Sequence, residues 1–210
     1  MADILLDVQG TPSTPAAGQA VLYVDTTSKK LAVKNDAGFN EGRTQNFSTA
    51  LQTPAAATLT YITGSALAIP SNKLQIGTCF RWTFDITKTA AGTATSTFAI
   101  AVGTTGSTAD TARVSFTKPA GTAAVDTATV TITAICRGPL SALGIFVGNF
   151  KLVKNAAEAA GHTTTPSTSL TTVSGAFDVT VAALIVGLVV TTGALDVITI
   201  QMVQAEAWNL

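Results

Sequence analysis

Charged residues are scarce in this chain, and their scarcity excludes two broad classes of protein. Only 11% of the 210 residues are charged, and 12 basic side chains balance 12 acidic ones. A nucleic-acid-binding protein presents a basic surface to phosphates, so we expect no nucleic-acid partner. Disordered chains combine high charge with low hydrophobicity, whereas 47% of these residues are hydrophobic. The chain is therefore expected to fold, with part of its surface covered by partner subunits.

Cysteine is equally scarce. Cys79 and Cys136 lie in separate, strand-like segments and form no C-x-x-C pair. We interpret both as small buried hydrophobic residues. A disulfide between them stays open, because its geometry cannot be judged from sequence, but a secreted disulfide framework is not indicated.

Long apolar runs are missing too. The most apolar stretch, residues 181–190, is too short to cross a bilayer. The first ten residues carry acids where a signal peptide needs basic residues. We therefore expect no membrane partner and read residues 176–184 and 185–192 as two buried strands or one long strand, with Gly187 marking a bend or a close approach.

The residues that most catalytic sites need are few and scattered. His162 is the single histidine, and it has no cysteine or carboxylate at metal-ligand spacing, so we place it in an exposed loop. Asp110, Asp126, Asp178 and Asp196 flank expected turns, where aspartate caps backbone groups. The sequence therefore predicts no catalytic residue, no cofactor and no metal site, and we expect the protein not to be an enzyme.

Strict alternation of apolar and polar residues is the strongest positive signal. In residues 79–87, every second residue is large and apolar: Phe80, Trp82, Phe84 and Ile86. Similar segments recur at 58–63, 96–103, 112–117, 127–137, 143–153 and 196–208, separated by turn-forming residues. Apart from a possible helical turn at 155–160, helical periodicity is absent. These segments predict an all-β fold with an antiparallel β-sandwich, jelly-roll-like or Greek-key, over residues 56–210.

The first 55 residues have a different character. Pro12 and Pro15 favour an extended arm over residues 1–18, and residues 19–38 read as a β-hairpin. Residues 39–57 read as a connector. A lone hairpin is marginal in water, so we expect residues 1–55 to dock on another surface. The candidate anchoring residues are Ile4, Leu5, Leu6, Pro15, Leu22, Tyr23, Val24, Leu31 and Val33.

Two segments resemble tailed-bacteriophage virion proteins. The first is carried by Pro12, Thr14, Pro15, Ala16, Ala17, Gly18, Leu22, Tyr23, Lys30, Leu31, Lys34 and Gly38. This pattern resembles the N-terminal segment shared by phage tail fibres and by head fibre or capsid decoration proteins. Residues 77–117 resemble the β-rich outer domain of such proteins. The chain lacks the long repetitive shaft of tail fibres, which favours a compact knob.

The resemblance implies a non-enzymatic virion structural protein on the outer capsid surface, assembled in the host cytoplasm. Its implied partners are the major capsid protein and two further copies of itself, as a homotrimeric decoration or cement protein. One alternative is a short tail fibre or spike adhesin that binds a host-surface glycan through loops 104–111 and 154–169, expected at one end of the sandwich. Another is a glycan-cleaving tailspike, which requires two placed carboxylates.

Overall fold

The structure is a computed structural model, and it describes residues 8–9, 12–13, 15–25, 31–35, 40–41, 44–69, 74–165 and 167–210. Within these residues the chain forms strands and no helix, so the expected all-β class is confirmed. The strands are β1 (Val8–Gln9), β2 (Ala20–Asp25), β3 (Leu31–Asn35), β4 (Asn40–Glu41), β5 (Thr44–Ser48), β6 (Leu59–Tyr61), β7 (Leu67–Ile69), β8 (Cys79–Lys88), β9 (Ser96–Gly103), β10 (Thr111–Lys118), β11 (Asp126–Cys136), β12 (Phe146–Lys154), β13 (Ser167–Val173), β14 (Leu184–Thr192) and β15 (Ile198–Trp208).

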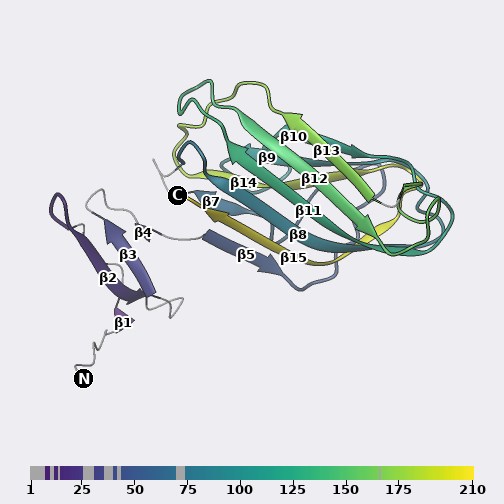
Figure 1. Cartoon of the computed structure of the whole chain (residues 1–210), viewed down its shortest axis with the longest axis horizontal. Helices are drawn as coiled ribbons and strands as arrows, with labels where there is room; N and C mark the ends of the chain where they lie inside the picture. Colours follow the sequence, from purple (N-terminus) through teal and green to yellow (C-terminus); the bar gives the residue numbers. More distant parts are fainter. Residues whose placement is uncertain are drawn as a thin grey trace. The chain divides into compact units, whose positions relative to one another are not determined.

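The N-terminal strands form a small sheet of their own, in the order β1-β2-β3-β4 (Figure 1). β2 and β3 pair antiparallel, with Leu22 opposite Val33, as expected for the hairpin. β1 adds to β2 in parallel, and β4 adds to β3 antiparallel, so the hairpin has a short strand on each side. The sheet belongs to a compact unit that ends at Arg43.

The second compact unit begins at Thr44, earlier than the boundary expected from the sequence. Residues 44–48 were predicted to lie in the connector, but they form β5 and pair antiparallel with β15. These residues lack the alternation of apolar and polar side chains that predicts a half-buried strand. The apolar side chain of Phe47 points outward and is 71% exposed, while the polar side chain of Ser48 is buried. β5 is therefore held by its backbone partner rather than by an apolar face.

Two antiparallel sheets pack face to face in the second unit, which confirms the predicted β-sandwich (Figure 1). The six-stranded sheet has the order β13-β12-β11-β8-β15-β5, and the other has the order β10-β9-β14-β6, with β7 also paired to β14. Consecutive strands β9–β10, β11–β12 and β12–β13 are neighbours, whereas the chain changes sheet between β8 and β9, β10 and β11, and β13 and β14. This order is compatible with the expected jelly-roll-like topology.

The inward faces of the strands follow the predicted alternation. On β8, Phe80, Trp82, Phe84 and Ile86 are all buried. Phenylalanine rings join the two sheets: the ring centroid of Phe98 on β9 lies 5.8 Å from that of Phe84 and 5.5 Å from that of Phe150. The centre of the sandwich is therefore a continuous aromatic and aliphatic core.

β14 contains most of the apolar stretch 181–190 and is buried on both faces. On its outer side, Tyr61 packs against Ala99, Ala101 and Val189. A Cβ atom at Gly187 would collide with the Tyr61 hydroxyl. The expected close approach at Gly187 is thus made by an aromatic side chain.

The segment before β14 was predicted as a further strand, and this is wrong. Residues 176–183 make one isolated bridge, between Phe177 and Gly144, and then turn. Asp178 closes the local turn by accepting hydrogen bonds from the backbone N–H and the hydroxyl of Thr180. The apolar alternation of this segment therefore reflects a loop that packs on the sandwich.

Candidate functional site

The N-terminal sheet holds part of the predicted anchoring set. Tyr23 is buried and Leu22 is 46% exposed, while Pro15, Val24 and Val33 are half-buried. Leu31 pairs with Val24 across the hairpin. The remaining three residues of the set, Ile4, Leu5 and Leu6, lie outside the described residues. The structure therefore brings several of these positions into one small sheet, with Leu22 presenting apolar surface.

The outer strands of this sheet are short. In the described part of the chain, β1 pairs only with Val24 and Asp25 of β2, and β4 pairs only with Val33 and Lys34 of β3. Edge strands are the positions where an additional strand from another protein can join a sheet. Main-chain pairing is therefore the interaction that this unit is best built to make.

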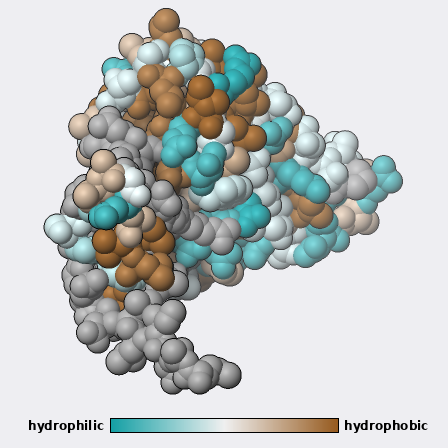
Figure 2. All heavy atoms as spheres, turned by 60° about the vertical axis from the view of Figure 1, so that its left-hand side comes forward, coloured by the Kyte–Doolittle hydropathy of each residue, from teal (hydrophilic) through white to brown (hydrophobic). Residues whose placement is uncertain are grey.

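One end of the sandwich is apolar, and we call it the apolar end: residues 74–78, 137–145 and 174–183. Its exposed large side chains include Ile76 and Leu143, which are 62% and 63% exposed. Figure 2 brings this end forward and shows hydrophobic side chains gathered in its upper part. Contiguous exposed apolar surface on a soluble domain marks an interaction site.

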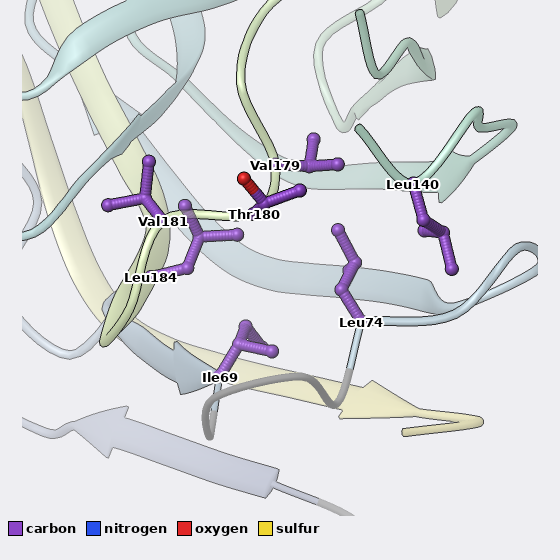
Figure 3. Close-up of a pocket in the computed structure, with 7 residues that line it drawn as sticks. All are labelled: Ile69, Leu74, Leu140, Val179, Thr180, Val181 and Leu184. Carbon is purple, nitrogen blue, oxygen red and sulfur yellow. The ribbon is translucent and has the colours of Figure 1, made fainter. Parts of the chain in front are cut away.

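A pocket of about 180 Å³ opens at the apolar end, and side chains from separate segments converge on it (Figure 3). Its lining is aliphatic except for one threonine: Ile69, Leu74, Leu140, Val179, Thr180, Val181 and Leu184. The backbone of the turn holds the lining in place, because Val179 N–H donates to Ser141 O at 3.2 Å and Phe177 N–H donates to Gly144 O at 3.0 Å. An apolar cavity of roughly 150 Å³ accommodates a benzene-sized group. This pocket therefore fits one apolar side chain.

The opposite end of the sandwich is polar inside, and we call it the lysine end: the loops 89–95, 119–125, 155–165 and 193–197 with the strand ends beside them. Three strands of the described chain terminate there on a buried lysine, namely β8 at Lys88, β10 at Lys118 and β12 at Lys154. Each lysine occupies the inward position that continues the apolar alternation of its strand. The same register places buried Ser96, Asp126, Thr192 and Asp196 at this end.

The lysine ammonium groups cap loop carbonyls. Lys88 Nζ donates to Thr122 O and Ala124 O, each at 2.6 Å. Lys154 Nζ donates to Thr163 O at 2.7 Å and also to the carbonyls of Ala157 and Ala160. Backbone carbonyls at the end of a sandwich would otherwise be buried without donors. The buried lysines therefore supply the hydrogen-bond donors that neighbouring strands supply within a sheet, and they hold the loops in place in this way.

Asp126 organises the same loops by accepting hydrogen bonds. Its Oδ1 accepts from the N–H groups of Thr127 and Ala156, and its Oδ2 accepts from His162 N–H at 2.8 Å. The predicted backbone-capping role of Asp126 is confirmed, at the start of β11 and at two points of the loop that follows β12. Asp110 does the same locally, accepting from Thr105 and Gly106.

The prediction that His162 lies exposed in a loop is wrong. Its side chain is fully buried, and among the described residues neither ring nitrogen has a hydrogen-bond partner. Burial lowers the pKa of His162 to about 4, so the ring is neutral at pH 7. This burial is not visible from the polar residues around His162 in the sequence. The signal that was overlooked is the lysines themselves, which occupy inward positions of otherwise apolar strands.

The loops proposed as one glycan-binding surface lie at opposite ends. Loop 104–111 follows β9 at the end where Val102 pairs with Thr111, and loop 154–169 follows β12 at the end where Lys88 pairs with Asp126. The β8–β9 connection joins Lys88 to Ser96, at the other end of β9 from Val102. The two loops therefore cannot form a single site within one chain.

The remaining sequence expectations concern reactive and bound groups. Cys79 and Cys136 are both free thiols; Cys136 is buried and Cys79 is half-buried. Across the described ranges, no cluster of histidine, cysteine and acidic side chains is arranged to hold a metal ion. The described residues contain no helix that is long and apolar enough to cross a membrane. No protein-family model matches the sequence, and no curated protein matches it significantly.

Proposed function

We propose that this chain is a non-enzymatic virion structural protein that attaches to the outside of a tailed-phage capsid as a trimer and stabilises the shell. The observation that carries the proposal is the separate N-terminal sheet. Residues 12–38, which resemble the attachment segment of phage fibres and decoration proteins, fall within the unit that ends at Arg43. The segment that carries the resemblance therefore lies within a compact unit of its own.

In the proposed mechanism the N-terminal sheet docks on the capsid. The outer strands are two residues long, so capsid strands would extend the sheet by main-chain hydrogen bonds, and Leu22 would enter an apolar site. Binding across neighbouring capsid subunits would bury surface between them and resist internal pressure. The jelly-roll-like sandwich would project outward.

The apolar end supports the trimeric state. Ile76 and Leu143 are exposed beside a pocket that fits one apolar side chain. Interface cores are depleted in charged residues, and the low charge of the chain agrees with this. Three copies would cover the apolar ends that a monomer leaves in water.

A binding assay on decoration-free shells tests the anchoring role. The variant that lacks residues 2–40 keeps the whole sandwich unit, and we expect it to lose shell binding. In the full chain, Leu22→Asp should weaken binding, while Ile135→Asp, at a residue of nearly the same exposure on the sandwich, should not. A deletion variant that decorates shells as well as the full chain would overturn the proposal.

The copy number in purified particles tests the location. Quantitative mass spectrometry against the major capsid protein should find hundreds of copies if the protein covers the shell. A handful of copies would instead place it at the tail or a vertex and favour the adhesin alternative. In that case a glycan site would have to lie at one end of the sandwich or between subunits.

A further inference from the structure

Lys118 and Asp196 form a pair at the lysine end that the fold does not explain. Lys118 Nζ lies 3.9 Å from Asp196 Oδ2, and both side chains are fully buried. Lys118 ends β10 in one sheet, and Asp196 lies in the loop that leads into β15 in the other sheet. The pair therefore spans the two layers of the sandwich.

Within the described residues, the side chain of Lys118 makes hydrogen bonds and the side chain of Asp196 makes none. Lys118 Nζ donates to Pro119 O at 3.0 Å, His162 O at 3.1 Å and Ala94 O at 3.4 Å. Among the described residues, neither carboxylate oxygen of Asp196 has a hydrogen-bond partner. A buried, ionised carboxylate without donors is strongly unfavourable, so the pair is poorly stabilised as an ordinary salt bridge.

Burial also favours the uncharged forms of both groups. Desolvation lowers the pKa of Lys118 and raises the pKa of Asp196. An ammonium that passes its proton to the neighbouring carboxylate leaves a free amine beside a carboxylic acid. An amine is a nucleophile, and a protonated carboxyl is a better electrophile than a carboxylate.

We propose that Lys118 and Asp196 condense into an intramolecular isopeptide bond. After one proton has moved from Nζ to the carboxylate, the Nζ lone pair attacks Cγ of Asp196. The tetrahedral intermediate transfers a second Nζ proton to a hydroxyl, which departs as water with the electrons of the broken C–O bond. One Nζ–Cγ bond forms, one C–O bond breaks, and no oxidant or reductant is required.

The other buried groups of the lysine end are not placed for this reaction. Asp126 accepts three backbone hydrogen bonds, which occupy both of its carboxylate oxygens. Lys88 Nζ and Lys154 Nζ donate to carbonyls at 2.6 and 2.7 Å, and these bonds hold both Nζ atoms against the loop backbone. Only Lys118, among the described lysines, lies within 4.0 Å of Asp196. Holding the two reactants together in a water-excluded site supplies the proximity that the step needs.

The bond would change the mechanical properties of the sandwich. It would join the end of β10 to the start of β15 and enclose β11, β12, β13 and β14 in a covalent loop. A cross-link of this kind restricts the unfolded chain as a disulfide does, and it needs no oxidising compartment. The inference does not depend on the proposed location in a virion.

Intact-mass spectrometry of the denatured full chain provides the test. We expect a mass lower than the sequence mass by one water molecule. Trypsin should then yield one branched product that joins residues 114–137 to residues 155–210, since Lys118 precedes a proline and no lysine or arginine lies within 155–210. Lys118→Met should restore the full mass, and Lys151→Met, at an exposed position, should keep the loss of water.

Two results with the wild-type chain, and one with the Lys118→Met variant, would overturn the proposal. The first is a wild-type chain of full sequence mass that yields the two tryptic peptides separately. The second is a loss of water confined to the unbranched peptide 155–210, which would indicate cyclisation of an aspartate onto the backbone. A water loss that persists in Lys118→Met would have the same meaning.

Discussion

Trp82 donates its indole N–H to the backbone carbonyl of Ser65 at 2.8 Å, and both residues are completely buried. Ser65 lies between β6 and β7, so this bond ties one sheet to β8 of the other. The Ser65 hydroxyl in turn donates to Ile62 O at 2.6 Å and accepts from Leu188 N–H at 2.9 Å. A short polar network therefore crosses the apolar core and specifies how the sheets meet.

Replacing Trp82 with phenylalanine should destabilise the protein by roughly 1–3 kcal/mol, the cost of leaving a buried carbonyl without its donor. The smaller ring also leaves a gap, which adds to the loss. Urea unfolding followed by circular dichroism measures the free energy of unfolding. The control is Trp208→Phe, at a half-buried residue near the C-terminus. Equal stabilities for the two variants would contradict a structural role for the Trp82–Ser65 bond.

A methyl group at Gly187 should be poorly tolerated. A Cβ atom there would collide with the Tyr61 hydroxyl, whereas a Cβ atom at Gly175 would meet nothing within 4 Å. We expect Gly187→Ala to lower stability by about 1–3 kcal/mol, because the tyrosine must leave its packed position. Gly175→Ala should leave the melting temperature nearly unchanged. Two variants with the same melting temperature would show that Tyr61 moves aside without cost.

Lys154 and Lys151 lie on the same strand but should respond differently to substitution by methionine. Lys154 is buried and caps the carbonyls of loop 155–165, whereas Lys151 points outward and is exposed. Lys154→Met leaves buried carbonyls without donors, so we expect a loss of about 1–3 kcal/mol. Thermal unfolding measures this loss of stability, and proteolysis within residues 155–165 measures the loosening of the loop. If Lys151→Met were the more damaging variant, the assigned capping role would be wrong.

His162 should make the protein sensitive to acid. The pKa of His162 falls from 6.5 to about 4 on folding, because burial disfavours the charged ring. Between these values the unfolded chain binds a proton that the folded protein does not, so stability decreases as the pH falls through this window. The expected slope from this group is about 1.4 kcal/mol per pH unit.

The comparison with His162→Phe isolates that contribution. Other groups that titrate over this range contribute to the acid response of both proteins. The difference between wild type and variant cancels this shared background. We expect denaturant unfolding at several pH values to give a shallower acid loss for the variant. Parallel curves would mean that His162 is accessible to protons in the folded state.

Several features of the fold were predictable because they depend on local geometry. Successive side chains of a strand point to opposite faces, so the alternation in residues 79–87 identified the buried face of β8. The same reasoning identified the hairpin of β2 and β3. It failed for β5, whose only large apolar residue, Phe47, faces outward, and for residues 176–183, where alternation accompanies a packed loop.

The candidate sites were less accessible to sequence reasoning. The alternation that ends in Lys88, Lys118 and Lys154 was present in the sequence, but lysine at an inward position is interpretable only when carbonyl partners are known. The pocket at the apolar end draws on residues from 69 to 184. Its lining depends on which loops meet, and that information is non-local.

The sequence by itself determined the all-β class, the inward face of each long strand and the distinct N-terminal segment, because strand periodicity and turn chemistry act over a few neighbouring residues. Only the tertiary structure decided the order of the strands, the separation of loops 104–111 and 154–169, and the burial of His162. It also decided that Lys118 and Asp196 meet. These outcomes depend on contacts between residues far apart in the chain, where packing and desolvation outweigh local preference.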